Sequence, residues 1–176
     1  ELDFDAVQTV FNVFEQVPGR HFLDTIEEED ADTSLVARVP HSSGLLNEQV
    51  RPDTELGEGD HRGHRPDEWY ETGWEKLETL RFLERDGERT MGQAAIQWLL
   101  GHDAVAAVTP TFRTADDIDE WAAAPSTPAL SDEEMARVEE LYRTNFGVDR
   151  DDGMDALRSS VGGDDLAGTG MQSAGD

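Results

Sequence analysis

Arg113 and Thr114 stand where a predicted strand meets a predicted helix, and this position suits an anion. Thr114 and Asp117 form a capping-box pattern, so a helix is predicted to begin directly after Thr114. The first N–H groups of a helix lack partners within it and lie at the positive end of its dipole, so they attract anions. Arg113 can add a bidentate guanidinium. The pattern therefore predicts a phosphate site. A second interpretation is that Thr114 only caps the helix and that Arg113 pairs with Asp116 or Asp117.

The elements that would position this site follow from the apolar pattern, in which strands and helices alternate. Such alternation implies parallel strands joined by right-handed crossovers, which is an α/β fold. A polar stretch with Pro52 and three glycines, residues 47–65, predicts a long loop. The predicted strands cover residues 5–14, 35–39 and 104–109, and the predicted helices cover residues 20–29 and 66–83 and begin after Thr90, Thr114 and Ser131.

The chain is strongly acidic: 40 acidic and 14 basic side chains among 176 residues give a net charge of −26. Nucleic acids and anionic membranes need clustered Lys and Arg, so we expect neither as a partner. Apolar runs are far shorter than the roughly 20 residues that cross a bilayer.

Lys76 is the single lysine, and carboxylates occur along every segment. This pattern favours a cytoplasmic protein adapted to high salt, although an ordinary acidic protein is the alternative.

His61 and His64 have a spacing that also occurs in metal sites, and Asp60 and Asp67 lie near them. The chain has no cysteine, and the loop specifies no third strong ligand. We therefore expect a solvated loop and no metal.

Three segments resemble the C-terminal half of the aldo-keto reductases. They are QTVFN at residues 8–12, VARVPHSSGLL at residues 36–46 and AIQWLLGHDAVAAVTPTFRTADDIDEW at residues 95–121. The resemblance implies a (β/α)8 TIM barrel, of which this chain supplies about the last three strands and their helices. Three strands cannot close a barrel. We expect residues 1–146 to be the cofactor-binding C-terminal portion of that barrel and residues 147–176 to be an acidic, Gly-rich, largely disordered tail.

The resemblance also implies how a dinucleotide would be held along the first two of these strands. Gln8 would hydrogen-bond the nicotinamide carboxamide, and Arg38 would pack against the nicotinamide ring. The alternative for Arg38 is a salt bridge at the top of the barrel. Pro40, Ser42 and Gly44 belong to the turn that would follow the pyrophosphate, where glycine allows close backbone approach.

At the third strand, Thr111, Arg113 and Thr114 would hold the phosphate on the adenosine ribose, which favours NADP over NAD. Asp117 and Trp121 occupy positions where the family often has Gln and Asn. An acidic side chain near that phosphate is unfavourable, so NAD stays possible. The loop at residues 47–65 would lie over the pyrophosphate as a strap.

The function implied by the resemblance is NADP-dependent reduction of small-molecule carbonyl compounds to alcohols. The catalytic Asp, Tyr, Lys and His of the family belong to earlier strands. Tyr70, Tyr142 and Lys76 fall on helices that would lie outside the barrel, so we assign no catalytic residue. These segments alone are then expected to be inactive. The alternatives are a non-catalytic, dinucleotide-binding regulatory subunit and a truncated inactive fragment. The oligomeric state is left open.

Overall fold

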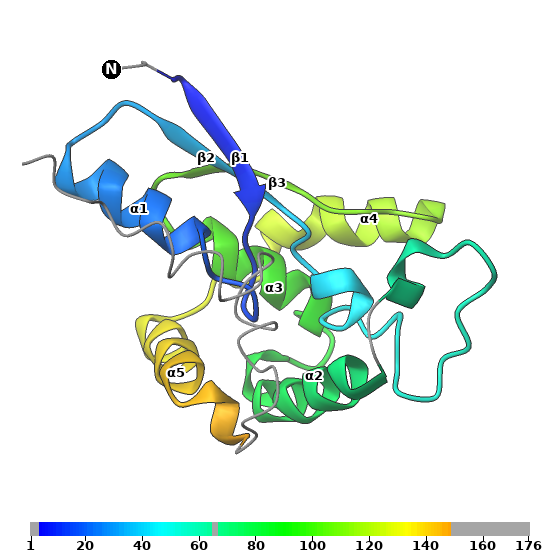
Figure 1. The fold of residues 1–176 in the computed structure, drawn as a ribbon. Coiled ribbons are helices and arrows are strands. Elements are labelled where there is room, and N and C mark those ends of the chain that lie inside the picture. Colours follow the sequence, from blue (N-terminus) through cyan, green and yellow to red (C-terminus); the bar gives the residue numbers. More distant parts are fainter. Residues whose placement is uncertain (1–3, 65–66, 149–176) are drawn as a thin grey trace, which may run out of the picture.

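A computed structural model of the chain describes residues 4–64 and 67–148 (Figure 1). The strands β1 (Ala6–Val10), β2 (Ser34–Arg38) and β3 (Val105–Thr109) form one parallel sheet in the order β1-β2-β3. The α-helices are α1 (Gly19–Glu28), α2 (Asp67–Thr79), α3 (Met91–Leu100), α4 (Ala115–Ala123) and α5 (Asp132–Arg143). The predicted α/β alternation with parallel strands is confirmed.

The two faces of the sheet have different surroundings. Leu35 and Ala37 are fully buried on the face that packs against α1 and α3, and Figure 1 shows the helices gathered on this side. The register aligns Gln8 with Val36, and side chains alternate between faces along a strand. Gln8 and Arg38 are exposed on the opposite face, which we call the bare face.

The first strand is shorter than predicted. Phe11–Phe14 is apolar enough to continue a strand, but the ladder ends at Val10. The Asn12 side chain causes the turn, because its Oδ1 accepts hydrogen bonds from the backbone N–H groups of Phe14 (3.0 Å) and Glu15 (2.9 Å). An Asn that bonds the backbone two residues ahead replaces a strand with a turn.

The helix starts agree with the sequence prediction. In each of three capping boxes the first side chain accepts from a backbone N–H three residues ahead, and the second side chain accepts from the first residue's own N–H. The capping pairs are Thr90 with Gln93, Thr114 with Asp117 and Ser131 with Glu134.

The long helix predicted at residues 66–83 is divided in the structure. The α-helix ends at Thr79, and a short 3-10 helix, Arg81–Leu83, follows it.

One buried arginine joins three segments of the helical layer. Arg89 has a fully buried side chain. Its Nε donates to the Leu83 carbonyl (2.8 Å), and its Nη1 donates to the carbonyls of Pro128 (2.7 Å) and Ala129 (3.1 Å). Its Nη2 pairs with Glu134 Oε1 at 2.6 Å. Arg89 therefore ties the start of α5 to the segment before α3.

The predicted acidic tail at residues 147–176 lies outside the described residues, apart from Gly147 and Val148. No described helix has both the length and the apolar character needed to cross a bilayer.

Candidate functional site

A cavity of about 310 Å³ lies where the carboxyl ends of the strands meet. Val10 and Arg38 end β1 and β2, and Thr111 follows β3 closely. Ligands of open α/β sheets bind at this edge, because the loops after the strands enclose it. The cavity is lined by Val10, Glu15, Arg38, Val39, Pro40, His41, Ser43, Gly44, Asn47, Gln49, Arg62, Thr111 and Arg113.

Three arginines and one carboxylate, that of Glu15, line this cavity in a chain of net charge −26. Lys76 is the only lysine among 14 basic residues, so 13 are arginines. Arg38, Arg62 and Arg113 all line the same cavity. Guanidinium groups bind phosphate oxygens through paired N–H donors. Arginines therefore outnumber carboxylates three to one in the cavity lining, whereas acidic residues outnumber basic ones in the whole chain, and this difference favours an anionic ligand.

Arg62 is held in a fixed position. Its Nε and Nη2 donate to the two carboxylate oxygens of Asp60, at 2.9 and 2.6 Å. The Tyr70 hydroxyl donates to the Arg62 carbonyl at 2.8 Å. The hydrogen bonds from Arg62 hold the pKa of Asp60 well below its usual range, so Asp60 stays ionised. Arg113 Nη2 lies 3.8 Å from the same carboxylate. Asp60 therefore orients two cavity arginines together.

The turn after β2 has an unusual backbone. Val39 and Ser43 have φ angles of 57° and 56°, although left-handed values are uncommon for residues other than glycine and are strained for β-branched valine. Gly44 has a φ of 97°, and a Cβ there would lie 3.2 Å from Arg62 Nη1. Such backbone outliers cluster at binding sites, where neighbouring contacts hold them. All three residues line the cavity.

Ser42 does not line the cavity but bonds to Glu15, which does. Its Oγ donates to Glu15 Oε2 at 3.0 Å, and Asn12 Nδ2 donates to the same oxygen at 2.9 Å. All three residues are fully buried. The Glu15 carboxylate therefore fixes both the Asn12 turn after β1 and the serine turn after β2.

The start of α4 already carries an anionic group of its own. Asp117 Oδ2 accepts from the backbone N–H groups of Arg113 (2.7 Å) and Thr114 (3.1 Å). The bond from Arg113 is the main cause of an Asp117 pKa below its ordinary value. Thr114 is thus a helix cap, and the ion pair of Arg113 among the described residues is with Asp60, not with Asp116 or Asp117. A phosphate here would be held chiefly by the Arg113 side chain.

His41 lines the cavity as a neutral, buried imidazole. Its Nε2 lies 3.1 Å from the Gly92 carbonyl oxygen, which can only accept, so Nε2 carries the proton. Its ring centroid lies 4.3 Å from that of Trp121. Burial lowers the pKa of His41 from 6.5 to about 4, against the smaller opposing effects of the Gly92 bond and Asp117.

The structure brings together most of the residues that the sequence singled out. Arg38, Pro40, Gly44, Thr111 and Arg113 line one cavity. Ser42, Thr114 and Asp117 adjoin it through the contacts given above. Gln8 lies apart from the cavity lining, on the bare face and two residues before Val10.

Sequence reasoning missed Glu15 and Arg62. The only signal for Arg62 was an arginine close to Asp60 in the polar loop, and such pairs are frequent in a chain with 40 acidic residues.

Within residues 4–64 and 67–148, no three His, Asp or Glu side chains are grouped as a metal site would require.

Comparison with known families assigns the chain. The family model described as "Aldo/keto reductase family" matches residues 1–143. The chain belongs to the aldo/keto reductase family. A search of curated proteins found no match.

Solved structures with a similar fold are aldo-keto reductases. The aldo-keto reductase AKR11C1 from Bacillus halodurans, in its holo form, is 22% identical with a TM-score of 0.56, over 78% of this chain and 41% of that one. The glycerol dehydrogenase AKR11B4 from Gluconobacter oxydans is 20% identical with a TM-score of 0.67, over 84% of this chain and 45% of that one. The chain thus spans less than half the length of these relatives.

Aldo-keto reductases are TIM-barrel proteins, and the three-stranded sheet is consistent with part of such a barrel. In a barrel, helices cover the outside of the sheet and the inner face points toward the other strands. The packed face with Leu35 and the bare face with Gln8 are consistent with these two sides.

Proposed function

We propose that this chain is the dinucleotide-binding, C-terminal part of an NADP(H)-dependent aldo-keto reductase that reduces small-molecule carbonyl compounds to alcohols. The observation that carries the proposal is the convergence of Arg38, Arg62 and Arg113 on one cavity at the carboxyl edge of the sheet. In a chain with a net charge of −26, a cavity lined by three arginines and one carboxylate, Glu15, favours an anionic ligand.

The cavity residues fit a pyridine dinucleotide. A cavity of about 310 Å³ is at the small end of the range for ligand pockets, which suits a pyrophosphate with an adjoining sugar. Arg62 and Arg113 would bind phosphate oxygens, and the turn at Gly44 would bring backbone close to them. When bound, the reduced dinucleotide supplies a hydride to the carbonyl carbon.

The family resemblance gives Arg38 and Gln8 their proposed roles, and both residues lie on the sheet near its carboxyl edge. Arg38 ends β2 at the cavity, and by the family resemblance its planar guanidinium would pack against the nicotinamide ring. Gln8 would bond the carboxamide from the bare face of β1. Both residues orient the ring, and neither transfers a proton.

Dinucleotide titration tests the proposal. NADPH fluorescence should give a dissociation constant for the full chain, and Arg62→Met or Arg113→Met should each weaken binding by about 10- to 100-fold, because each removes a charge-assisted phosphate contact worth roughly 1.5–3 kcal/mol. Arg143→Met is the matched control, because Arg143 pairs with Glu140 at the end of α5. The proposal fails if NADPH does not bind, or if all three variants bind alike.

A second candidate function is dinucleotide binding without catalysis. Tyr70 and Lys76 lie in α2, are almost fully buried and do not belong to the cavity lining, so neither is placed to act on a ligand in the cavity. The sequence encoded upstream of Glu1 distinguishes the two candidates: an in-frame Asp, Tyr, Lys and His at the catalytic positions of the family would support the reductase, and a stretch without them would support this candidate.

The acidic composition supports a salt-adapted cytoplasmic setting for this function. Molar salt shortens the Debye length to about 3 Å, which suppresses repulsion between surface carboxylates. The melting temperature should therefore rise between dilute and molar KCl, and an unchanged value would contradict the salt adaptation.

A further inference from the structure

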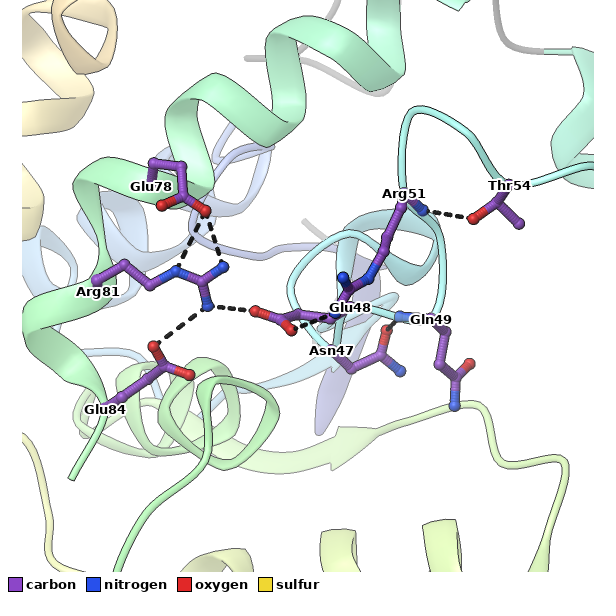
Figure 2. Close-up of polar contacts among 8 residues, drawn as sticks. All are labelled: Asn47, Glu48, Gln49, Arg51, Thr54, Glu78, Arg81 and Glu84. Atoms are coloured by element: carbon purple, nitrogen blue, oxygen red, sulfur yellow. Dashed lines mark hydrogen bonds and ion pairs between the residues drawn. The ribbon is translucent and has the colours of Figure 1, made fainter. Parts of the chain in front are cut away.

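The described part of the strap, residues 47–64, is attached to the helical layer by a group of charged side chains (Figure 2). This group lies outside the cavity lining, which includes none of Glu48, Arg51 and Arg81. The Glu48 carboxylate pairs with Arg81, which belongs to the 3-10 helix after α2. Glu48 Oε2 also accepts from Arg51 Nη2 at 3.3 Å. The guanidinium groups of Arg51 and Arg81 both lie over the Trp74 ring, at 5.3 and 5.8 Å from its centroid. The start of the strap is thus fixed to α2 by charge and by stacking.

Two other carboxylates, each three residues away from Arg81 in the sequence, also bind Arg81. Its Nη2 lies 2.8 Å from Glu78 and its Nη1 lies 3.2 Å from Glu84. Figure 2 shows the three carboxylates arranged around this one guanidinium. The hydrogen bond with Glu78 is the main cause of an Arg81 pKa above its ordinary value. Arg81 is therefore a fixed, permanently charged partner for Glu48.

The residue that follows Glu48 reaches the cavity. Gln49 lines the cavity and is exposed, so it lies at the cavity rim. Its Nε2 donates to Asp117 Oδ1 at 3.0 Å, across to the start of α4. Gln49 therefore bridges the rim between the turn after β2 and the turn after β3.

Glu48 has an uncommon backbone conformation that several contacts hold in place. Its φ angle is 56°, a left-handed value that costs energy in any residue other than glycine. Backbone bonds fix it on both sides, because Glu48 N–H donates to Leu45 (2.9 Å) and Val50 N–H donates to Gly44 (3.0 Å). The Arg81 pair adds the side-chain contact that favours this conformation.

We propose that Arg81 and Glu48 form a latch that positions Gln49 across the cavity rim and so slows the release of the bound dinucleotide. The inference rests on the proposed function, because it assigns the latch to the same cavity. Arg81 and Glu48 are positioning residues, since they act through Gln49 and do not line the cavity.

The chain offers a matched control for this latch. Glu78 and Glu84 bind the same guanidinium as Glu48 but lie outside the strap. Glu78→Gln and Glu84→Gln each weaken one ion pair of Arg81 without changing a strap residue. If Arg81 only stabilised the fold, all three substitutions would change the NADPH release rate equally. The latch predicts instead that Glu48→Gln changes this rate more than the other two substitutions do.

Stopped-flow displacement of NADPH from the full chain measures the release rate. Glu48→Gln should release NADPH about 5- to 20-fold faster than the unmodified chain, while Glu78→Gln and Glu84→Gln change the rate less than twofold. Gln49→Ala should reproduce the Glu48→Gln effect, because it removes the bridge itself. Equal release from the unmodified chain and Glu48→Gln, or equal acceleration in all glutamate variants, would overturn the proposal.

Hydrogen exchange of the dinucleotide-free chain gives a second readout that does not depend on binding. The Glu48 and Val50 amides should exchange several-fold faster in Glu48→Gln and be unchanged in Glu84→Gln. If they are equally protected in both variants, the latch does not exist. If exchange responds as expected but NADPH fails to bind the unmodified chain, the proposed function and the release role are overturned, whereas the fixing of the strap by Arg81 stands.

Discussion

Replacing His41 with leucine should change how the stability of the protein depends on pH. The imidazole in the unfolded chain takes up a proton below about pH 6.5. The buried imidazole of the folded chain, whose pKa is lowered to about 4, stays neutral until lower pH. The unfolded state therefore binds more protons between these values, so stability is full above pH 6.5 and is lost as the pH falls toward 4. At about 1.4 kcal/mol per pH unit, His41 costs the folded state about 3 kcal/mol by pH 4.

Urea unfolding followed by tryptophan fluorescence at several pH values between 7 and 4 measures this difference. His41→Leu loses the contact with Trp121, so its stability at pH 7 should fall, but its stability should decline about 3 kcal/mol less than that of the unmodified chain on acidification. Asp60 and Asp117, whose pKa values lie below their ordinary range, are present in both proteins and cancel in the comparison. Parallel pH profiles for His41→Leu and the unmodified chain would refute the burial argument.

Three further substitutions test the packing and the site. Arg89→Met should lower the free energy of unfolding by about 3–5 kcal/mol, because it leaves the buried Leu83 carbonyl without its donor and removes the closest ion pair of Glu134, and urea unfolding that shows a loss below about 1 kcal/mol would contradict this. Gly92→Ala places a Cβ 2.5 Å from Trp121 Cζ3, so a drop of about 1–3 kcal/mol is expected, and an unchanged melting temperature would count against the tight contact. Asp117→Asn removes a negative charge beside Arg113 and should tighten NADPH binding more than NADH binding, whereas equal effects on the two dissociation constants would place the ribose phosphate elsewhere.

The sequence was a good guide wherever the signal was local. Three of the predicted helices begin at capping boxes, and each of these consists of two side chains three residues apart, such as Thr114 and Asp117. The end of β1 was misplaced, because Phe11 and Phe14 read as strand residues. Asn12 overrides them with two side-chain bonds to the backbone, and an apolar pattern does not contain that information.

The site was predictable only in part, for a related reason. Parallel pairing places the ends of neighbouring strands at one edge, so Arg38 and Arg113 could be expected near each other. Arg62 and Glu15 lie in segments whose position depends on distant contacts, such as the approach of Asp60 to Arg113. The spacing of residues in the sequence does not show which distant segments come into contact.

Arg38 is the arginine for which the sequence left a salt bridge and a ring contact as alternatives. The chain has almost three acidic residues for each basic one, so an arginine can usually find a carboxylate. Arg81 binds three of them, and Arg89 and Arg62 each hold one. Arg38 forms no ion pair with any residue in the ranges 4–64 and 67–148, so the barrel-top salt bridge is not found there. Its guanidinium lies at the end of β2 against the cavity, where a planar ring or an anion can still reach it.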